Sequence, residues 1–408
     1  MLSLLFFIIC YATSILLFVG GCTPETTALP SDLEFSTFLP CAIADISLII
    51  LFIFIEARFF KMRINIPLII IMSCLFVVNL IVIVTTPLEN TFEYVYLETP
   101  GTALVTITNE HKVMYILCFV LLLLNIYISF NYLFYRVKFS KHFAWICILG
   151  IIGGFFFLIY SYVTEGETYK LFLENIQTTV RTYNPLSLTN NQNSFAAILL
   201  GAAFCSYGMF AVTRNHLFWI IGLFFCVNTM FPMSRICLIL SIVLTLMIFA
   251  YKMIITWKGH AFRNLNLIFL VVAPLTVFVI MCFNVTEIKD YIENVIMTND
   301  SSINSRTPLW ELTVSMTQGF HRFIGNGHGY FNTAFAYITL PYGQLKYPHN
   351  LYFTTYGALG IMGLAMVGCL ILFSLYKIIR LFIKNNRESA LISIIGMSML
   401  MVYYLVEG

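Results

Sequence analysis

Long uninterrupted apolar runs constrain the fold of this 408-residue chain more than any other feature. Hydrophobic residues make up 60% of the sequence and charged residues only 10%, whereas a soluble domain carries roughly 25% charged residues. A bilayer span needs about 20 consecutive apolar residues, and a buried core helix rarely has so many. The sequence therefore predicts an all-α, polytopic integral membrane protein, with residues 1–408 forming a single transmembrane domain.

The apolar runs predict eleven transmembrane helices. A secretory signal is the alternative for the first run, but the basic n-region that a signal peptide needs is absent, because the first basic residue is Arg58. The abrupt end at Val406-Glu407-Gly408 leaves room for a twelfth helix in a longer chain. The predicted helices fall near residues 4–20, 40–56, 66–86, 113–135, 143–162, 193–212, 217–232, 236–251, 266–284, 351–376 and 389–406.

Basic residues in the loops predict the orientation of the helices. With the N-terminus in the cytoplasm, the inner loops carry fourteen basic residues and two acids, a net charge of +12. The outer segments then carry eight basic residues and sixteen acids, a net charge of −8. The longest polar interruption, residues 285–350, is therefore predicted to be a large extracytoplasmic loop.

Ser234-Arg235 lies at the predicted outer start of a helix. An arginine on this side runs against the distribution of charge, and snorkelling to lipid headgroups is one explanation for it. Anion binding is the other, because serine is a good N-cap and helix N-termini attract phosphate groups.

A second candidate begins at Arg306 in the large loop. Thr307 suits an N-cap and Pro308 suits the first helical position. The apolar residues that follow predict a short amphipathic helix on the membrane surface. Arg306 at its positive end could bind a phosphate together with free backbone N–H groups, and pairing with Glu311 or a headgroup is the alternative. The apolar residues are Leu309, Trp310, Leu312, Val314 and Met316.

Pro348-His349-Asn350 opens the next helix, which Asn350 can cap. His349 can exchange protons near neutral pH, and a purely structural histidine is the alternative. His321 and His328 share the loop, but the spacings match no standard zinc motif, so we expect no metal site.

Alternating glycines at Gly325, Gly327 and Gly329 permit a tight turn and close approach of the backbone to a ligand. A plain turn is the alternative. Together these features place helix N-termini, two arginines and a histidine on one predicted outer surface. That combination fits a lipid-linked pyrophosphate better than a solute pathway, because a transporter carries ionisable residues near the midplane and Asp45 is the one clear candidate here.

The order of the motifs resembles a known family over residues 190 to 375, whereas the first half of the chain matches in hydropathy alone. The motifs are Asn190, Asn191 and Asn193 before Ser-Phe-Ala-Ala, then Ser234-Arg235, Arg306 with Trp310, the three alternating glycines, and His349-Asn350 followed by Gly357 and Gly360. The pattern is similar to that of the O-antigen ligase and O-antigen polymerase superfamily of bacterial envelope glycosyltransferases.

This resemblance implies an enzyme that uses a glycan carried on undecaprenyl pyrophosphate at the outer face of the bacterial cytoplasmic (inner) membrane. A polymerase extends the glycan with further lipid-linked repeat units into O-antigen or capsular polysaccharide, and a ligase transfers the finished chain to lipid A–core or another acceptor. We expect a polymerase, with a ligase as the first alternative and a flippase or permease as the second. The implied partners are the lipid-linked donor and acceptor, the bilayer, a flippase and a chain-length regulator, with no cofactor, nucleotide sugar, metal or nucleic acid.

The resemblance also implies roles for individual residues. Arg235 and Arg306 would contact the pyrophosphate, and His349 would activate the acceptor hydroxyl. Five residues are expected to support substrate binding: Arg181, Arg322, Asn193, Trp310 and Asn350.

Overall fold

The computed structural model describes most of the chain and divides it into two compact units. The first unit is Met1–Lys138, Ser302–Arg380 and Tyr404–Gly408, and the second is Phe139–Ser301 and Leu381–Tyr403. The described residues are 35–60, 66–96, 99–131, 139–174, 185, 187–189, 192–213, 215–232, 234–256, 306–339, 348–383, 394–399 and 401–403.

Six helices in the described part of the chain have the length and composition to cross a membrane, which supports a multi-pass membrane protein. Two of the eleven predicted spans, 4–20 and 266–284, lie outside the described residues, and residues 394–399 and 401–403 form helix within a third. The pair predicted at 217–232 and 236–251 gives shorter apolar stretches, His216–Asn228 and Ile236–Phe249. The six are Phe38–Ile55, Ile66–Thr85, Asn109–Ile128, Ala144–Thr164, Gln192–Thr213 and Leu351–Arg380.

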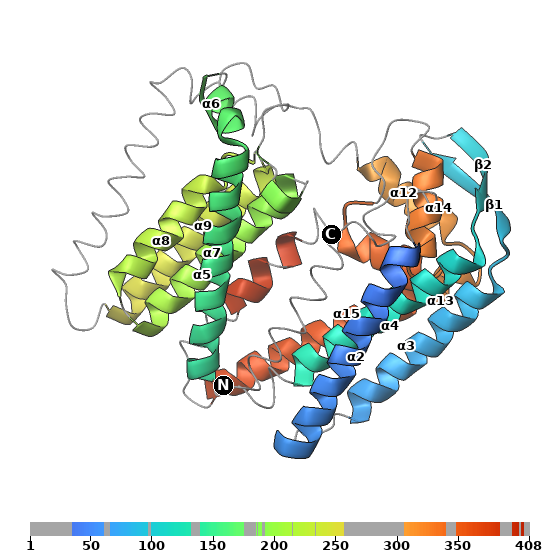
Figure 1. The fold of residues 1–408 in the computed structure, drawn as a ribbon, viewed down its shortest axis with the longest axis horizontal. Coiled ribbons are helices and arrows are strands. Elements are labelled where there is room, and N and C mark those ends of the chain that lie inside the picture. Colours follow the sequence, from blue (N-terminus) through green and yellow to red (C-terminus); the bar gives the residue numbers. More distant parts are fainter. Residues whose placement is uncertain are drawn as a thin grey trace. The chain divides into compact units, whose positions relative to one another are not determined.

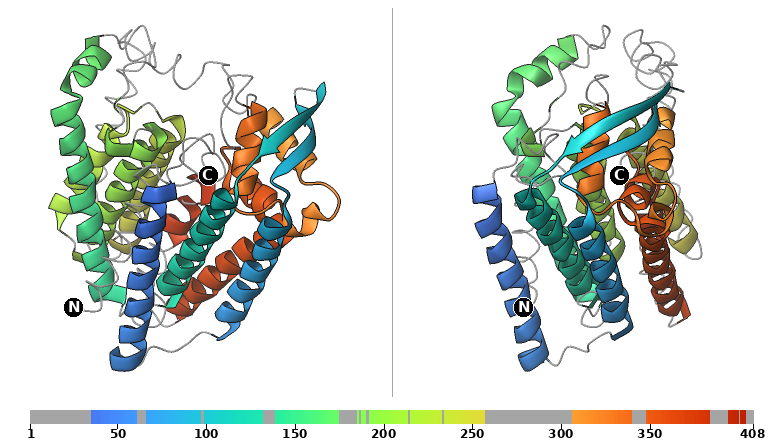
Figure 2. Two further views of the ribbon diagram at one scale, coloured as in Figure 1. Left: turned by 45° about the vertical axis from the view of Figure 1, so that its right-hand side comes forward. Right: turned by 90° about the vertical axis from the view of Figure 1, so that its right-hand side faces the viewer.

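The first unit combines long apolar helices with a two-stranded sheet and three short helices (Figure 1). Figure 2 shows the sheet at the end of the pair α3 and α4, which the hairpin connects. The elements are α2 (Phe35–Phe60), α3 (Ile66–Thr85), β1 (Glu89–Tyr96), β2 (Thr99–Thr106), α4 (Asn109–Asn131), α12 (Thr307–Met316), α13 (His321–Ile324), α14 (Tyr330–Thr339) and α15 (Leu351–Ile383).

The hairpin of β1 and β2 departs from the all-α prediction. Its strands are antiparallel, with Glu93 opposite Thr102 and Tyr94 opposite Gly101. Side chains alternate between the two faces of a strand, and Phe92 and Tyr96 are accordingly buried whereas Glu93 is exposed. The aromatic residues of this segment are good strand formers, so the strand signal was present between two predicted spans.

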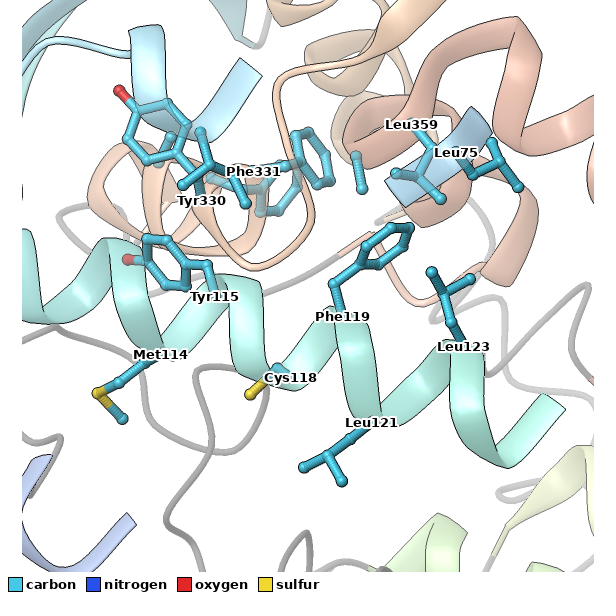
Figure 3. Close-up of a cluster of buried hydrophobic side chains, with 14 of the residues drawn as sticks. Leu75, Met114, Tyr115, Cys118, Phe119, Leu121, Leu123, Tyr330, Phe331 and Leu359 are labelled. Atoms are coloured by element: carbon cyan, nitrogen blue, oxygen red, sulfur yellow. The ribbon is translucent and has the colours of Figure 1, made fainter. Parts of the chain in front are cut away.

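Aromatic side chains pack α4 against α14 in the core of the first unit. Tyr115 and Phe119 on α4 lie toward Tyr330 and Phe331 of α14 (Figure 3), and all four are fully or almost fully buried. The hydroxyl groups of Tyr115 and Thr333 are 2.7 Å apart and share a hydrogen bond. Buried polar groups need such partners, so this contact fixes how α14 lies against α4.

The second unit is helical throughout its described residues, and α7 is its best-buried long helix. Small residues let the neighbours of α7 come close: a Cβ on Gly154 of α5 would lie 2.3 Å from the Cβ of Ala202. The hydroxyl groups of Tyr207 on α7 and Thr245 on α9 are 2.9 Å apart. The elements are α5 (Phe139–Thr164), α6 (Gly166–Glu174), η4 (Ser187–Thr189), α7 (Gln192–Thr213), α8 (His216–Asn228) and α9 (Arg235–Thr256).

Candidate functional site

Arg306 immediately precedes α12 and is only 7% exposed. The predicted cap is displaced by one residue, because Arg306 occupies the N-cap position and the helix begins at Thr307. Its side chain makes no capping hydrogen bond, and Pro308 lies in the first turn. A buried guanidinium at the positive end of a helix is a strong anion-binding arrangement.

The apolar face of α12 is covered by protein. Leu309, Leu312 and Met316 are buried, as their shared face predicts, whereas Val314 is 44% exposed. The helix packs against β1 of the hairpin. It was expected to rest on the membrane surface, but its apolar residues belong to the core of the first unit, so the position of Arg306 is set by protein packing.

Trp310 connects the start of α12 to the start of α15. Its indole Nε1–H donates to the carbonyl of Pro348 at 3.0 Å, and its ring stacks on Phe353 with centroids 5.3 Å apart and planes 5° apart. The backbone N–H of Trp310 donates to the carbonyl of Arg306 at 3.0 Å. A short chain of contacts therefore joins Arg306 to the residue that precedes His349.

His349 and Asn350 immediately precede α15, and both are conformationally constrained. Asn350 caps the helix as predicted, because its Oδ1 accepts from the N–H groups of Tyr352 at 2.9 Å and Phe353 at 3.2 Å. His349 is 7% exposed and has a φ of +53°. Few non-glycine residues adopt a positive φ, and such strain accumulates at functional sites. The backbone conformation is therefore fixed at the residue that follows the Pro348 contact with Trp310.

The glycine turn packs against a break in α15. Gly360 interrupts this helix with φ +62° and ψ −156°, and the carbonyls of Gly357 and Ala358 accept from the N–H groups of Asn326 and Gly327, each at 2.9 Å. In a regular helix these carbonyls accept from the N–H four residues further on. The turn thus satisfies backbone groups that the break releases, as a broken helix in a membrane protein requires.

The three glycines of the turn, Gly325, Gly327 and Gly329, all have positive φ. A Cβ at Gly325 would lie 2.3 Å from the backbone of Ala358, so contact with α15 requires glycine there. The Nδ1–H of His321 donates to the carbonyl of Gly325 at 2.8 Å. The glycines therefore serve close packing of backbone on backbone.

Sequence reasoning missed two asparagines that hold the turn. Asn79, 1% exposed within α3, accepts through Oδ1 from the N–H of His328 at 2.8 Å. The side-chain amide of Asn326 donates to the carbonyls of Met316 and Gly357 at 3.3 and 3.2 Å. Asn79 stands out as an amide within the apolar run of residues 66–86, and that was the available signal.

The remaining candidates divide between the units. Arg322 lies on α13 and is exposed. Asn193 is half-buried in the first turn of α7, and Arg235 is the first residue of α9. Arg181 lies outside the described residues. The first unit therefore brings Arg306, Trp310, His349 and Asn350 together, whereas the convergence of Arg235 with them stays a prediction.

Ser234 occupies the N-cap position of α9, as predicted from its place before the helix. Its carbonyl accepts from the N–H of Leu238 at 3.0 Å. The hydroxyl is buried and makes no hydrogen bond to any described residue. A buried polar atom of this kind calls for an explanation, and a bound ligand is one.

These features define a multi-pass membrane protein whose polar site gathers at helix starts. A family model described as O-antigen ligase matches residues 216–368, a range that includes Arg235, Arg306, Trp310 and His349. Over these residues, the match confirms the resemblance to the O-antigen ligase and polymerase superfamily. No curated protein matches the chain. The hairpin at 89–106 precedes the matched range.

Proposed function

We propose that this protein is a membrane glycosyltransferase that polymerises undecaprenyl-pyrophosphate-linked repeat units at the outer face of the cytoplasmic membrane. The product is O-antigen or capsular polysaccharide. One observation carries the proposal: Arg306 is buried at a helix start and is tied through Trp310 to the segment that presents His349. A cation and a base on adjoining helix starts are what transfer from a pyrophosphate carrier requires.

The leaving group explains the need for Arg306. The acceptor hydroxyl oxygen forms a bond to the anomeric carbon, and the bond from that carbon to the phosphate oxygen breaks. The electron pair leaves with undecaprenyl pyrophosphate, so negative charge grows on the phosphate oxygen. A fixed guanidinium and a helix N-terminus stabilise this charge. Arg235, at the start of α9 beside Ser234, is proposed as the second phosphate ligand.

His349 is proposed as the general base that takes the proton from the acceptor hydroxyl. Its buried position and fixed backbone favour one orientation of the ring. Asn350, Asn193, Arg181 and Arg322 are proposed to contact the substrate, and Trp310 positions the two helix starts. No step needs a nucleotide sugar.

A ligase that transfers the finished glycan to lipid A–core or another acceptor is the second candidate. The match to a family described as O-antigen ligase favours it. The two activities differ in the acceptor, because a polymerase needs a second lipid-linked repeat and a ligase needs a different lipid or protein.

Deletion of the gene, followed by analysis of the surface and carrier-linked glycan, tests the proposal. Loss of a polymerase leaves single repeats, whereas loss of a ligase leaves full-length chains on the carrier lipid. Complementation with the intact gene is the control. Unchanged surface glycan in the deletion strain would overturn both activities.

A further inference from the structure

A groove of about 860 Å³ runs beside β1 in the first unit. Hairpin residues that include Asn90, Glu93 and Tyr94 line one wall. The other wall comes from the segment between the end of α12 and the start of α14, including His321 and Tyr330. Its volume is in the range of about 300–1,000 Å³ that small-molecule sites occupy, and Arg306, Trp310, His349 and Asn350 do not line it.

The lining combines aromatic rings with uncharged hydrogen-bonding groups and one carboxylate. Tyr94 and Tyr330 supply rings, and Tyr330 lies 5.8 Å from Phe92 between centroids. The amide of Asn90 donates to the hydroxyl of Tyr330 at 3.3 Å. Burial raises the pKa of Tyr330 to about 12, partly offset by that bond, so the hydroxyl is neutral at physiological pH. Glu93 is exposed at the groove.

This chemistry matches a saccharide better than a lipid tail or an anion. Sugar rings have apolar C–H faces that pack on aromatic rings, and a rim of hydroxyl groups that donate to carboxylates and bond to amides. A carboxylate in the wall disfavours a phosphate by repulsion. A lipid tail would leave the polar groups of the wall without partners.

A peptide strand added to the edge of β1 is the competing occupant. Ser315 occupies that edge, because its hydroxyl lies 3.3 Å from the backbone nitrogen of Val95 and 3.5 Å from its carbonyl oxygen. Strand addition needs a continuous row of backbone groups, and this contact interrupts the row. The groove therefore favours a saccharide.

The position of the groove relates it to the proposed transfer site. Ser315 and Met316 line it at the C-terminal end of α12, whereas Arg306 lies at the N-terminal end. The helix has 10 residues, so about 15 Å separates its ends at about 1.5 Å per residue. A glycan whose pyrophosphate lay at Arg306 would reach the groove after a few sugar units.

We propose that this groove is a saccharide-binding subsite that holds the growing glycan away from the point of transfer and so governs product length. The inference rests on the proposed glycosyltransferase function. The hairpin wall lies before the range that the family model matches, whereas the other wall lies within it. The hairpin is therefore the part of the subsite that would set this chain's own preference among glycans.

Two matched substitutions test the subsite. Glu93→Gln changes a carboxylate in the groove, and Glu89→Gln changes an exposed carboxylate on the same strand that does not line it. Tyr94→Leu, checked for an unchanged unfolding midpoint, is the second groove variant. The full chain in nanodiscs is titrated by calorimetry with the lipid-free oligosaccharide that mild acid releases from the host's lipid-linked pool.

We expect Glu93→Gln and Tyr94→Leu each to weaken saccharide binding about tenfold, which corresponds to about 1.4 kcal/mol, and to shorten the glycan chains made in cells. Glu89→Gln is expected to change neither. Equal binding by wild type and both groove variants would overturn the subsite, as would equal weakening by Glu89→Gln. A co-purifying protein released by Glu93→Gln, without any saccharide binding, would overturn it in favour of peptide docking.

The Arg306→Ala variant separates this inference from the proposed function. It lacks the proposed phosphate ligand but keeps the groove, so it is expected to bind the oligosaccharide like wild type while its transfer falls by about 10²–10³-fold. Absence of transfer by the wild-type protein would defeat the glycosyltransferase proposal, whereas the saccharide titration would still decide whether the groove binds sugar.

Discussion

The helices α7 and α15 are both long and apolar, but they are used differently within their units. In the second unit, α7 is packed closely by α5 and α8, with small residues at the contacts. In the first unit, α15 breaks at Gly360 and gives two backbone carbonyls to the glycine turn. Hydropathy alone does not distinguish them. The comparison teaches that α15, which begins beside the candidate site residues, is broken further along by a contact with the glycine turn, whereas the uninterrupted α7 serves packing.

The largest effect on transfer is expected from a substitution just before α15. His349→Asn removes the proposed base but keeps a residue that tolerates the positive φ. Transfer should fall by about 10²–10⁴-fold, the usual contribution of a general base, while binding of the lipid-linked donor is retained. Single-turnover assays and donor binding in nanodiscs measure the two quantities. Turnover at the wild-type rate would remove His349 from the mechanism.

Arg306→Ala is expected to reduce transfer by about 10²–10³-fold, because it removes charge stabilisation from the leaving group. Arg306→Lys should restore part of the activity, since lysine keeps the charge but loses the bidentate geometry. Glycan laddering on gels and in vitro transfer measure the effect. Arg380→Ala, which changes an exposed arginine near the end of α15, is the control. Full activity of Arg306→Ala would contradict the proposed phosphate contact.

Gly360→Ala tests whether the break in α15 serves the site. A Cβ there would lie 2.5 Å from the backbone of Phe323, and the glycine conformation costs other residues about 1–3 kcal/mol. We expect both a lower unfolding midpoint in detergent and more than tenfold slower transfer. Gly368→Ala on the same helix meets nothing within 4 Å and should be tolerated. Equal behaviour of the two variants would refute a special role for the break.

Gly154→Ala makes the corresponding change beside α7. The new Cβ would lie 2.3 Å from that of Ala202, and overpacking of this kind costs about 1–3 kcal/mol. The unfolding midpoint should fall while the folded fraction keeps its transfer rate. Gly153→Ala has open space and is the control. A large loss of transfer in stably folded Gly154→Ala protein would show that the packing of α7 also shapes the site.

The smallest effect is expected for Trp310→Phe. This variant keeps an aromatic ring against Phe353 but loses the hydrogen bond to the Pro348 carbonyl. One such bond contributes about 1 kcal/mol, so we expect a several-fold slower transfer. Trp310→Ala, which also removes the stacking, should be worse. Identical rates for Trp310→Ala and wild type would show that the link between α12 and α15 is dispensable.

The sequence predicted the membrane spans far better than the site's supports. The spans at 66–86 and 193–212 correspond closely to Ile66–Thr85 and Gln192–Thr213, because length and hydrophobicity suffice for a bilayer helix. Asn350 as a cap also follows from local chemistry. The partnership of the glycine turn with Gly357 and Ala358 does not, since it depends on contacts between distant segments. The hairpin does not follow from hydropathy, because its strands lie in the connection between two predicted spans.

Asn79 carries a consequence for engineering this protein. It lies in α3, ahead of the range that matches the family model, yet it accepts the N–H of His328 inside that range. A chimera that joins residues 216–368 to the N-terminal helices of another protein would leave the backbone N–H of His328 without its acceptor. The exception is a chimera whose N-terminal helices carry a side-chain oxygen at the position of Asn79 Oδ1. Leaving a buried N–H donor without an acceptor costs about 1–3 kcal/mol. The side chain of Asn79 therefore limits which N-terminal helices can be combined with residues 216–368.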